Sequence, residues 1–181
     1  MTSKFQAMIP ALCLLLILLG LAVPCRTAGA AEEPPLLVVR VLHSQSAYAP
    51  GGTYPLALEL TIRQGYHINS DRPKEADVYP SRAKLTGAQD VTVGPVVFPQ
   101  PKSYKPSFSS QPMEVFDGRI LLRSTLTVAK GAKPGPRQLN ASLDFQGCDD
   151  QACLMPETLE VAIPAGVGPG GQALNQEVFR K

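Results

Sequence analysis

The stretch Tyr54-Pro-Leu-Ala-Leu-Glu-Leu-Thr-Ile62 alternates between apolar and other side chains. Successive side chains of an extended chain point to opposite faces, so every second residue shares a face. One face carries four large apolar residues: Leu56, Leu58, Leu60 and Ile62. Glu59 and Thr61 fall on the other face. This pattern predicts a β-strand with one buried side.

Other segments on both sides of this strand have a similar character. We expect strands at Leu36–His43, Ala83–Thr86, Val91–Phe98, Arg119–Val128, Gln138–Phe145 and Thr158–Ile163. Pro and Gly separate them, and apolar residues nowhere recur with a sustained helical period. Short strands at this spacing predict an all-β chain that folds as a β-sandwich.

Two segments between or after these strands have a different composition. Residues 99–112 are rich in Pro, Ser, Lys and aromatic residues, which excludes a central strand. A loop of this length often carries function when it is ordered. The Gly/Pro tract that begins at Pro164 predicts a flexible C-terminal tail over 165–181. The sandwich domain is therefore expected over 31–164.

The first thirty residues have the anatomy of a secretory signal. Lys4 precedes an apolar run over about 11–23, and the small residues Ala28-Gly29-Ala30 offer a cleavage site. The run is shorter than the roughly 20 apolar residues that a transmembrane helix needs. Pro24 disfavours lipoprotein anchoring at Cys25. We therefore expect residues 1–30 to be a cleavable signal peptide.

Loss of this segment leaves a chain without net charge. It contains two of the 17 basic residues, Lys4 and Arg26, and none of the 15 acidic residues. The remaining chain therefore has no basic surplus of the kind that nucleic-acid binding requires. The Gly/Pro tract also lacks the Lys-Ser/Thr ending of a phosphate-binding loop, so neither nucleic acid nor a nucleotide cofactor is expected.

Cys148 and Cys153 are the cysteines that remain after removal of residues 1–30, which hold Cys13 and Cys25. Predicted strands flank this pair, so Asp149-Asp150-Gln151-Ala152 is expected to form the tip of a hairpin or a short irregular turn. Neighbouring strands bring opposite residues to about 4.5–5.5 Å. That separation lies within the span of a disulfide, so the pair can close.

The residues alone leave three interpretations of the cysteine pair open. A structural disulfide across so short a loop contributes only about 2 kcal/mol. A redox pair needs an attacking thiolate and a nearby resolving thiol, although Asp149 and Asp150 disfavour a strongly activated cysteine. A metal site is the weakest interpretation, because His43 and His67 are the only histidines that could add nitrogen ligands.

Three segments resemble the N-terminal periplasmic domain of the thiol:disulfide interchange protein DsbD. They are Gly65-Tyr-His-Ile-Asn-Ser-Asp-Arg-Pro73, Val115-Phe-Asp-Gly118 and Phe145-Gln-Gly-Cys-Asp-Asp-Gln-Ala-Cys-Leu-Met-Pro-Glu157. Their order and spacing cover about residues 36–164. The resemblance implies an immunoglobulin-like β-sandwich in the periplasm. It also implies a cysteine pair that receives electrons from a membrane partner and passes them to oxidised exported proteins.

The resemblance also implies roles for individual residues. Cys153 would attack the partner, and Cys148 would resolve the mixed disulfide. Phe116, beside Glu114, would cap the disulfide, and Tyr66 and His67 would lie near it. Without the resemblance, Phe116 is interpreted as a core aromatic and His67 as a partly buried strand residue.

This chain departs from the family pattern at the cysteine segment. Four residues separate its cysteines where the family has five, and one proline follows Cys153 at Pro156 where the family has two. Family proteins continue into a membrane domain and a thioredoxin-like domain, so a separate DsbD/CcdA-like membrane thiol electron transporter is the expected donor.

Two functions thus remain. The first is a protein-disulfide reductase component that acts on oxidised periplasmic thiol proteins, in disulfide isomerisation or cytochrome c maturation. The second is a non-catalytic binding or adaptor domain whose Cys148–Cys153 disulfide is structural. Neither function calls for a cofactor or a metal.

Overall fold

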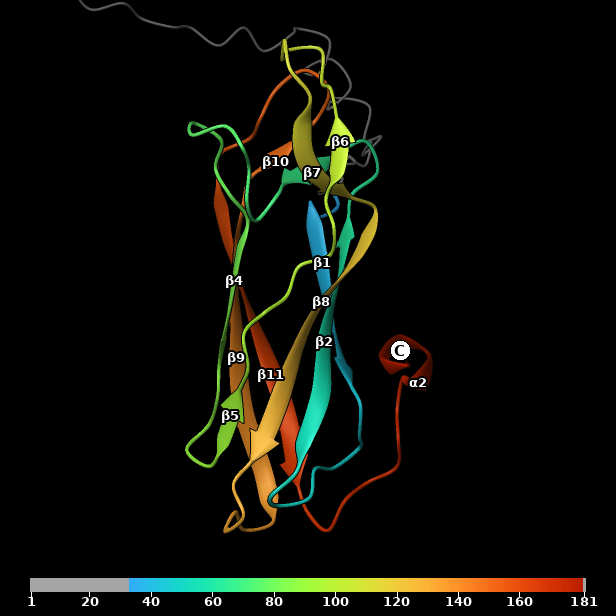
Figure 1. The fold of residues 1–181 in the computed structure, drawn as a ribbon, viewed down its shortest axis with the longest axis vertical. Helices are drawn as coiled ribbons and strands as arrows, with labels where there is room; N and C mark the ends of the chain where they lie inside the picture. The colour runs from blue at the N-terminus through green and yellow to red at the C-terminus, as the bar shows by residue number, and fades with distance from the viewer. Residues whose placement is uncertain (1–32, 181) are drawn as a thin grey trace, which may run out of the picture. The chain divides into compact units, whose positions relative to one another are not determined.

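The computed structural model describes residues 33–180, and nearly all of their regular structure is β (Figure 1). From Pro34 onward the chain forms one compact unit. The predicted signal peptide, with Cys13 and Cys25, lies outside the described residues. Between residues 33 and 180, no helix has the length and apolar character needed to cross a membrane.

Two antiparallel sheets form the sandwich. The first has the order β1 (Leu37–His43), β2 (Thr53–Ile62), β8 (Arg119–Val128) and β5 (Val91–Val93). The second has the order β11 (Glu157–Val167), β9 (Gly135–Phe145) and β4 (Arg82–Thr86). The fold class is therefore all-β and immunoglobulin-like, as the sequence and the resemblance predicted.

A third, smaller sheet lies at one end of the sandwich (Figure 1). Its order is β10 (Gly147–Cys148), β3 (His67–Asn69), β7 (Met113–Asp117) and β6 (Lys102–Tyr104). Its strands have only two to five residues, too few to show an alternation that predicts a strand. The edge strand β6 lies within the predicted loop 99–112. This small sheet carries Cys148.

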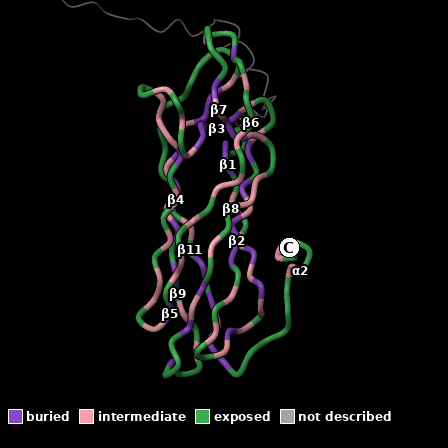
Figure 2. The backbone as a smooth tube through the Cα atoms, in the orientation of Figure 1, coloured by how far each residue is buried: buried purple, intermediate pink, exposed green. Residues whose placement is uncertain are grey.

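The core lies between the two larger sheets, where buried stretches of the strands face one another (Figure 2). The four apolar residues predicted to share one face of β2 are all buried. Three of them join a cluster that also contains Leu126 of β8 and Leu139 of β9. Burial of a side chain of this kind contributes roughly 1.5–3 kcal/mol. The alternation in β2 therefore places the core correctly.

Three predicted strand boundaries differ from the structure by more than one residue. Strand β9 begins at Gly135 rather than Gln138. The strand from Val91 ends at Val93 rather than Phe98, because Gly94 and Pro95 follow and only Val97 makes an isolated bridge, to Arg123. Strand β11 continues past the predicted end at residue 163 to Val167. It includes Pro164, which is tolerated because β11 is an edge strand whose outer side needs no backbone donor.

The segment expected to be a flexible tail, 165–181, begins inside β11 and then runs beside the residues that follow β1. The backbone N–H of Ser46 donates to Gln172 O at 2.9 Å, and the N–H of Leu174 donates to Ser44 O at 2.9 Å. A short helix, α2 (Gln176–Phe179), follows. The ordered domain thus extends beyond the predicted boundary at residue 164.

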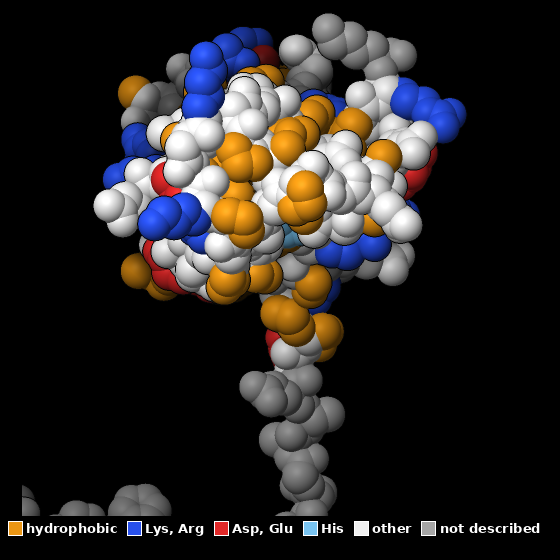
Figure 3. All heavy atoms as spheres, turned by 90° about the horizontal axis from the view of Figure 1, so that it is seen from below, with side chains coloured by type: hydrophobic (Ala, Val, Ile, Leu, Met, Phe, Trp, Pro, Cys, Tyr) orange, Lys and Arg blue, Asp and Glu red, His pale blue; other side chains and the backbone are white. Residues whose placement is uncertain are grey.

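Figure 3 views the molecule from the lower end of Figure 1. Hydrophobic side chains are interspersed over this face, and Lys and Arg side chains lie mostly toward its margin. Among the described residues on this face, the cations do not merge into the continuous basic surface that nucleic-acid binding requires.

An ion pair joins the two large sheets. Arg137 of β9 donates from Nε and Nη2 to the two carboxylate oxygens of Asp90, both at 2.6 Å, and Asp90 immediately precedes β5. Bidentate geometry of this kind is the strongest form of the arginine–carboxylate pair. The hydrogen bond from Arg137 holds the pKa of Asp90 below its ordinary value of 3.8.

We expect Asp90→Asn to lower the melting temperature near neutral pH and to have less effect in acid. A carboxyl group whose pKa is lowered by folding stabilises the fold above its ordinary pKa, and this contribution is lost as pH falls through the folded-state value. Thermal unfolding of both proteins at about pH 7 and about pH 3 tests this. A difference in melting temperature that does not shrink in acid would contradict it.

Candidate functional site

Cys148 and Cys153 form a disulfide at the base of a tight hairpin, as the sequence predicted for the turn between them. The S–S distance is 2.07 Å and the Cα atoms are 4.0 Å apart. The backbone N–H of Asp149 donates to Ala152 O at 3.0 Å, and the N–H of Leu154 donates to Gly147 O at 2.8 Å. These hydrogen bonds close the turn around the two sulfur atoms.

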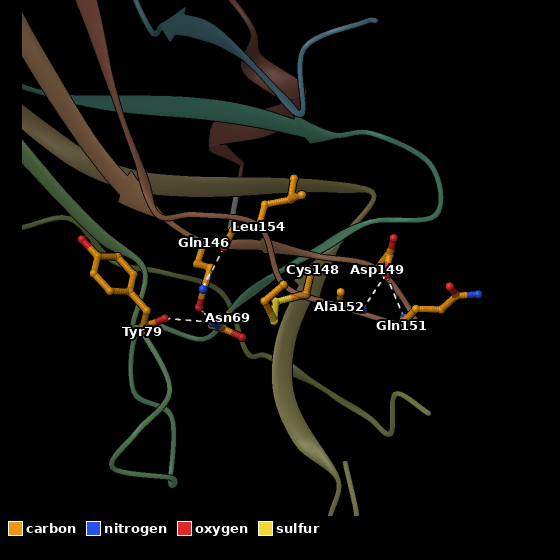
Figure 4. The surroundings of a disulfide bond; sticks show 9 residues. Asn69, Tyr79, Gln146, Cys148, Asp149, Gln151, Ala152 and Leu154 are labelled. Carbon is orange, nitrogen blue, oxygen red and sulfur yellow. Dashed lines mark hydrogen bonds between the residues drawn. A yellow bond between two sulfur atoms is a disulfide. The ribbon is translucent and has the colours of Figure 1, made fainter. Parts of the chain in front are cut away.

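The side chain of Asp149 stabilises this turn from within (Figure 4). Its Oδ1 accepts the backbone N–H groups of Gln151 at 2.7 Å and Ala152 at 2.8 Å. These donors favour the ionised carboxylate and lower the pKa of Asp149. Asp is favoured at this position because its short side chain can bond to backbone two and three residues further on.

Two amide side chains connect the hairpin to its surroundings, and sequence reasoning missed both (Figure 4). Gln146 Nε2 donates to Leu154 O at 2.9 Å. Asn69 Nδ2 donates to Gln146 Oε1 at 3.3 Å and to Tyr79 O at 2.9 Å. Asn69 is buried in β3, so these hydrogen bonds hold the cysteine hairpin against the small sheet. Amide residues have no spacing signature that would reveal this arrangement.

The two cysteines differ in accessibility. Cys148, which pairs with β3, is 0% exposed, whereas Cys153 lies on the surface. The exposed apolar residues Leu154 and Met155 follow Cys153 directly. A partner thiol can therefore approach the sulfur of Cys153 while that of Cys148 is covered.

His67 lies directly opposite Cys148 in the small sheet. Cys148 of β10 pairs with His67 of β3, and His67 pairs with Asp117 of β7. His67 is 4% exposed, and its Nε2 is buried without a hydrogen-bond partner. Burial lowers the pKa of His67, although Asp117, Asp149 and Asp150 act in the opposite direction. The predicted neighbourhood of His67 and the cysteines is thus present in the structure.

Tyr66 borders a pocket beside His67. The guanidinium carbon of Arg63 lies 4.2 Å from the centre of the Tyr66 ring, a favourable cation–π distance. The pocket has a volume of about 490 Å³, and its polar and aromatic lining includes Arg63, Tyr66, His67, Lys102, Tyr104 and Asp117. In the order of the strands, β3 with His67 lies between Cys148 of β10 and the strands β7 and β6, which also line the pocket.

Phe116 is not on the disulfide side of the sheet. It is 2% exposed, pairs with Ile68 of β3 and stacks on Phe98 with ring centres 5.6 Å apart. Since Asp117 shares a face with His67 and Cys148, its neighbour Phe116 points to the opposite face. The structure thus supports the interpretation of Phe116 as a core aromatic and corrects the expected cap. Glu114 forms an ion pair with Lys74 at 2.9 Å.

The segment that contacts the cysteine turn comes instead from β6 and the loop after it. The hydroxyl of Tyr104 donates to Asp150 Oδ1 at 3.0 Å, and the backbone N–H of Ser107 donates to Asp150 O at 3.1 Å. The hydrogen bond to this carboxylate raises the pKa of Tyr104. Phe108, which follows Ser107, is 44% exposed. The predicted functional loop 99–112 therefore does reach the site, through residues that the sequence did not single out.

We expect Tyr104→Phe to accelerate reduction of the disulfide by dithiothreitol about threefold to tenfold. The substitution removes the hydroxyl that holds Asp150, and a hydrogen bond of this kind contributes roughly 1 kcal/mol. Quenching with a maleimide reagent and mass analysis would give the rate. Tyr54→Phe is the matched control. The Tyr54 hydroxyl hydrogen-bonds to the backbone of Ala49 near the start of β2, away from the cysteine turn. Equal rates in the two variants would contradict the expectation.

Cysteine thiolates are not free to bind a metal in this state, because both sulfur atoms are in the disulfide. Within residues 33–180, no three side chains of His, Cys, Asp or Glu come together as a ligand set.

Solved structures with a similar fold include two bacterial domains. The N-terminal domain of DsbD from Neisseria meningitidis, in its reduced form, is 17% identical with a TM-score of 0.46, and the match covers 78% of this chain and 96% of that domain. The N-terminal periplasmic domain of ScsB from Proteus mirabilis is 14% identical with a TM-score of 0.48. That match covers 78% of this chain and 51% of the ScsB chain.

No curated protein sequence matches the chain. A family model does match: it is described as "Thiol:disulfide interchange protein DsbD, N-terminal" and covers residues 36–165. This range includes the small sheet, the two cysteines and both large sheets except the last two residues of β11, and it amounts to well over half of the chain. The chain therefore belongs to the family of N-terminal domains of the thiol:disulfide interchange protein DsbD.

Proposed function

We propose that this protein is a periplasmic thiol:disulfide exchange module. It takes electrons from a DsbD/CcdA-like membrane thiol electron transporter and passes them to oxidised periplasmic thiol proteins. The observation that carries the proposal is a disulfide with one exposed and one buried cysteine, Cys153 and Cys148, in a chain of this family. Residues 1–30 direct its export.

The exchange proceeds in two balanced steps. The Cys153 thiolate attacks the disulfide of an oxidised partner, forms a mixed disulfide and releases one partner thiolate, which takes up a proton. Cys148 then loses its proton and attacks the sulfur of Cys153, which releases the second partner thiolate. The partner gains two electrons and two protons, and the Cys148–Cys153 disulfide forms. A dithiol of the membrane transporter restores the reduced pair by the same steps in reverse.

The accessibility of the two sulfurs supports this assignment of roles. An attacking or attacked sulfur must be reached by another protein, whereas a resolving thiol needs to reach only its neighbour. Exposed Cys153 meets the first requirement, and Cys148, buried five residues away in sequence, meets the second. Exchange between sulfur atoms needs no cofactor.

The alternative function, an adaptor domain with a structural disulfide, receives less support. A bridge across so short a loop adds only about 2 kcal/mol. The hairpin is also held by hydrogen bonds that do not involve sulfur, among them those of Asp149 and Gln146. A disulfide whose turn is also closed by hydrogen bonds is better explained by exchange than by stapling.

Trapping of the mixed disulfide tests the proposal. The mature domain carrying Cys148→Ser keeps Cys153 but cannot resolve, so it should accumulate an adduct with a periplasmic protein that dithiothreitol releases. The Cys153→Ser variant is the matched control and should form none. Absence of an adduct, while Cys153 reacts freely with a maleimide reagent, would favour the adaptor function.

A further inference from the structure

We propose that His67 accepts the proton of Cys148 when Cys148 resolves the mixed disulfide. This inference rests on the proposed function and assigns a positioning and proton-accepting residue to its second step. It concerns the buried cysteine, whose thiol has no direct route to bulk water for its proton because Cys148 is 0% exposed.

The sheet places the two side chains together. Cys148 and His67 are directly opposite in the antiparallel pair of β10 and β3, and opposite residues in such a pair lie on one face about 4.5–5.5 Å apart. The backbone on both sides holds this pairing, since β3 also pairs with β7. The separation between the Cα atoms of Cys148 and His67 is thus maintained by the sheet and does not depend on the disulfide alone.

The imidazole has an atom available for the proton. Nε2 of His67 is buried and has no hydrogen-bond partner, which is costly for a buried polar atom unless a partner is present in another state. His43 is different, because its Nδ1 lies 2.9 Å from the Tyr48 hydroxyl. In the reduced or mixed-disulfide protein, the free Cys148 thiol supplies a donor beside His67.

The charges around His67 suit a transient imidazolium. Burial disfavours the charged ring, so His67 is neutral at rest and able to accept a proton. Carboxylates from two elements lie near enough to favour the charged ring: Asp117 of β7, and Asp149 and Asp150 of the cysteine turn. Lys102 of β6 is paired with Asp117, and the Tyr104 ring centre lies 4.8 Å from that of His67. These carboxylates stabilise the cation once it forms.

The step conserves atoms and electrons. The S–H bond of Cys148 breaks, and its proton moves to His67. The Cys148 thiolate attacks Sγ of Cys153 and displaces the partner thiolate, so the intramolecular disulfide forms as the mixed disulfide breaks. The imidazolium then returns its proton to water or to the departing partner thiolate, and His67 is neutral again.

Stopped-flow reaction of the reduced protein with the aromatic disulfide DTNB separates the two steps. Attack by Cys153 releases one coloured thiolate at a rate that depends on DTNB concentration. Resolution by Cys148 releases the second at a rate that does not. We expect His67→Gln to slow the second step at least about tenfold near pH 7, as expected for loss of a proton acceptor. The two proteins should converge in strongly alkaline solution, where hydroxide can remove the proton of Cys148 without His67.

The controls distinguish this inference from the function on which it rests. The first step should be unchanged in His67→Gln, and His43→Gln should resemble the unsubstituted protein in both steps. An identical pH profile for the second step in His67→Gln would overturn the role of His67 and leave exchange intact. Absence of both steps in the unsubstituted protein would instead overturn the proposed function.

A second measurement keeps the inference testable if His67→Gln fails to fold. The ring nitrogens of both histidines can be followed by NMR in the unsubstituted protein, with His43→Gln providing the assignment. Reduction of the disulfide should shift the Nε2 signal of His67 and leave that of His43 in place. Unchanged His67 signals on reduction would contradict a contact with the Cys148 thiol.

Discussion

Iodoacetamide is expected to alkylate Cys153 of the reduced protein at least about 100-fold faster than Cys148. Cys153 is on the surface, whereas Cys148 is fully buried in the pairing between β10 and β3. Reagent can reach Cys148 only after local opening, and a 100-fold difference corresponds to an opening free energy of about 2.8 kcal/mol. Quenched time points and peptide mass analysis would give both rates.

Two variants provide the controls for this prediction. Cys148→Ser should react at the rate of Cys153 in the parent protein, and Cys153→Ser should react slowly. In denaturant both cysteines should react at similar rates, because burial is then lost. Comparable rates in the folded protein would contradict the division of roles between an attacking and a resolving cysteine.

Phe116→Ala is expected to reduce the free energy of unfolding by about 3–5 kcal/mol, the usual cost of truncating a buried Phe. Phe116 is 2% exposed, packs in the main core cluster and stacks on Phe98. Its removal leaves a cavity beneath the small sheet that carries Cys148. Urea unfolding followed by circular dichroism, with equal slopes for both proteins, would measure the loss.

Phe108→Ala is the matched control, since Phe108 is 44% exposed in the loop after β6. A surface truncation should change the free energy of unfolding by no more than about 0.5 kcal/mol. Its effect should appear in the rate of disulfide reduction, because Ser107 next to it bonds to Asp150. If Phe116→Ala proved as mild as Phe108→Ala, Phe116 would not be a core residue.

Most strands of the sandwich could be predicted because they are long and half-buried: β1, β2, β8, β9 and β11 have at least seven residues each. Leu56, Leu58 and Leu60 alternate over enough residues to identify both the strand and its core face. The four strands of the small sheet are short, and residues such as Lys102 and His67 show no such alternation. They become strands because they pair with one another, which local sequence does not encode.

The site divides in the same way. Spacing identified the cysteine pair and its hairpin, because both depend on residues close in sequence. The aromatic that borders the turn was misassigned to Phe116, since a single aromatic beside a strand does not indicate which face it occupies. Tyr104 reaches the turn from 46 residues away, through its hydroxyl and Asp150, and no local pattern predicts such a contact.

By itself the sequence determined that this protein is an all-β domain with one cysteine pair in a tight turn. Alternation, turn residues and cysteine spacing are local properties, and they act over a few residues. Only the tertiary structure decided that Cys148 is buried and Cys153 exposed, that His67 lies opposite Cys148, and that Phe116 belongs to the core. Burial and strand register depend on distant segments packing together, so they emerge only when the whole chain has folded.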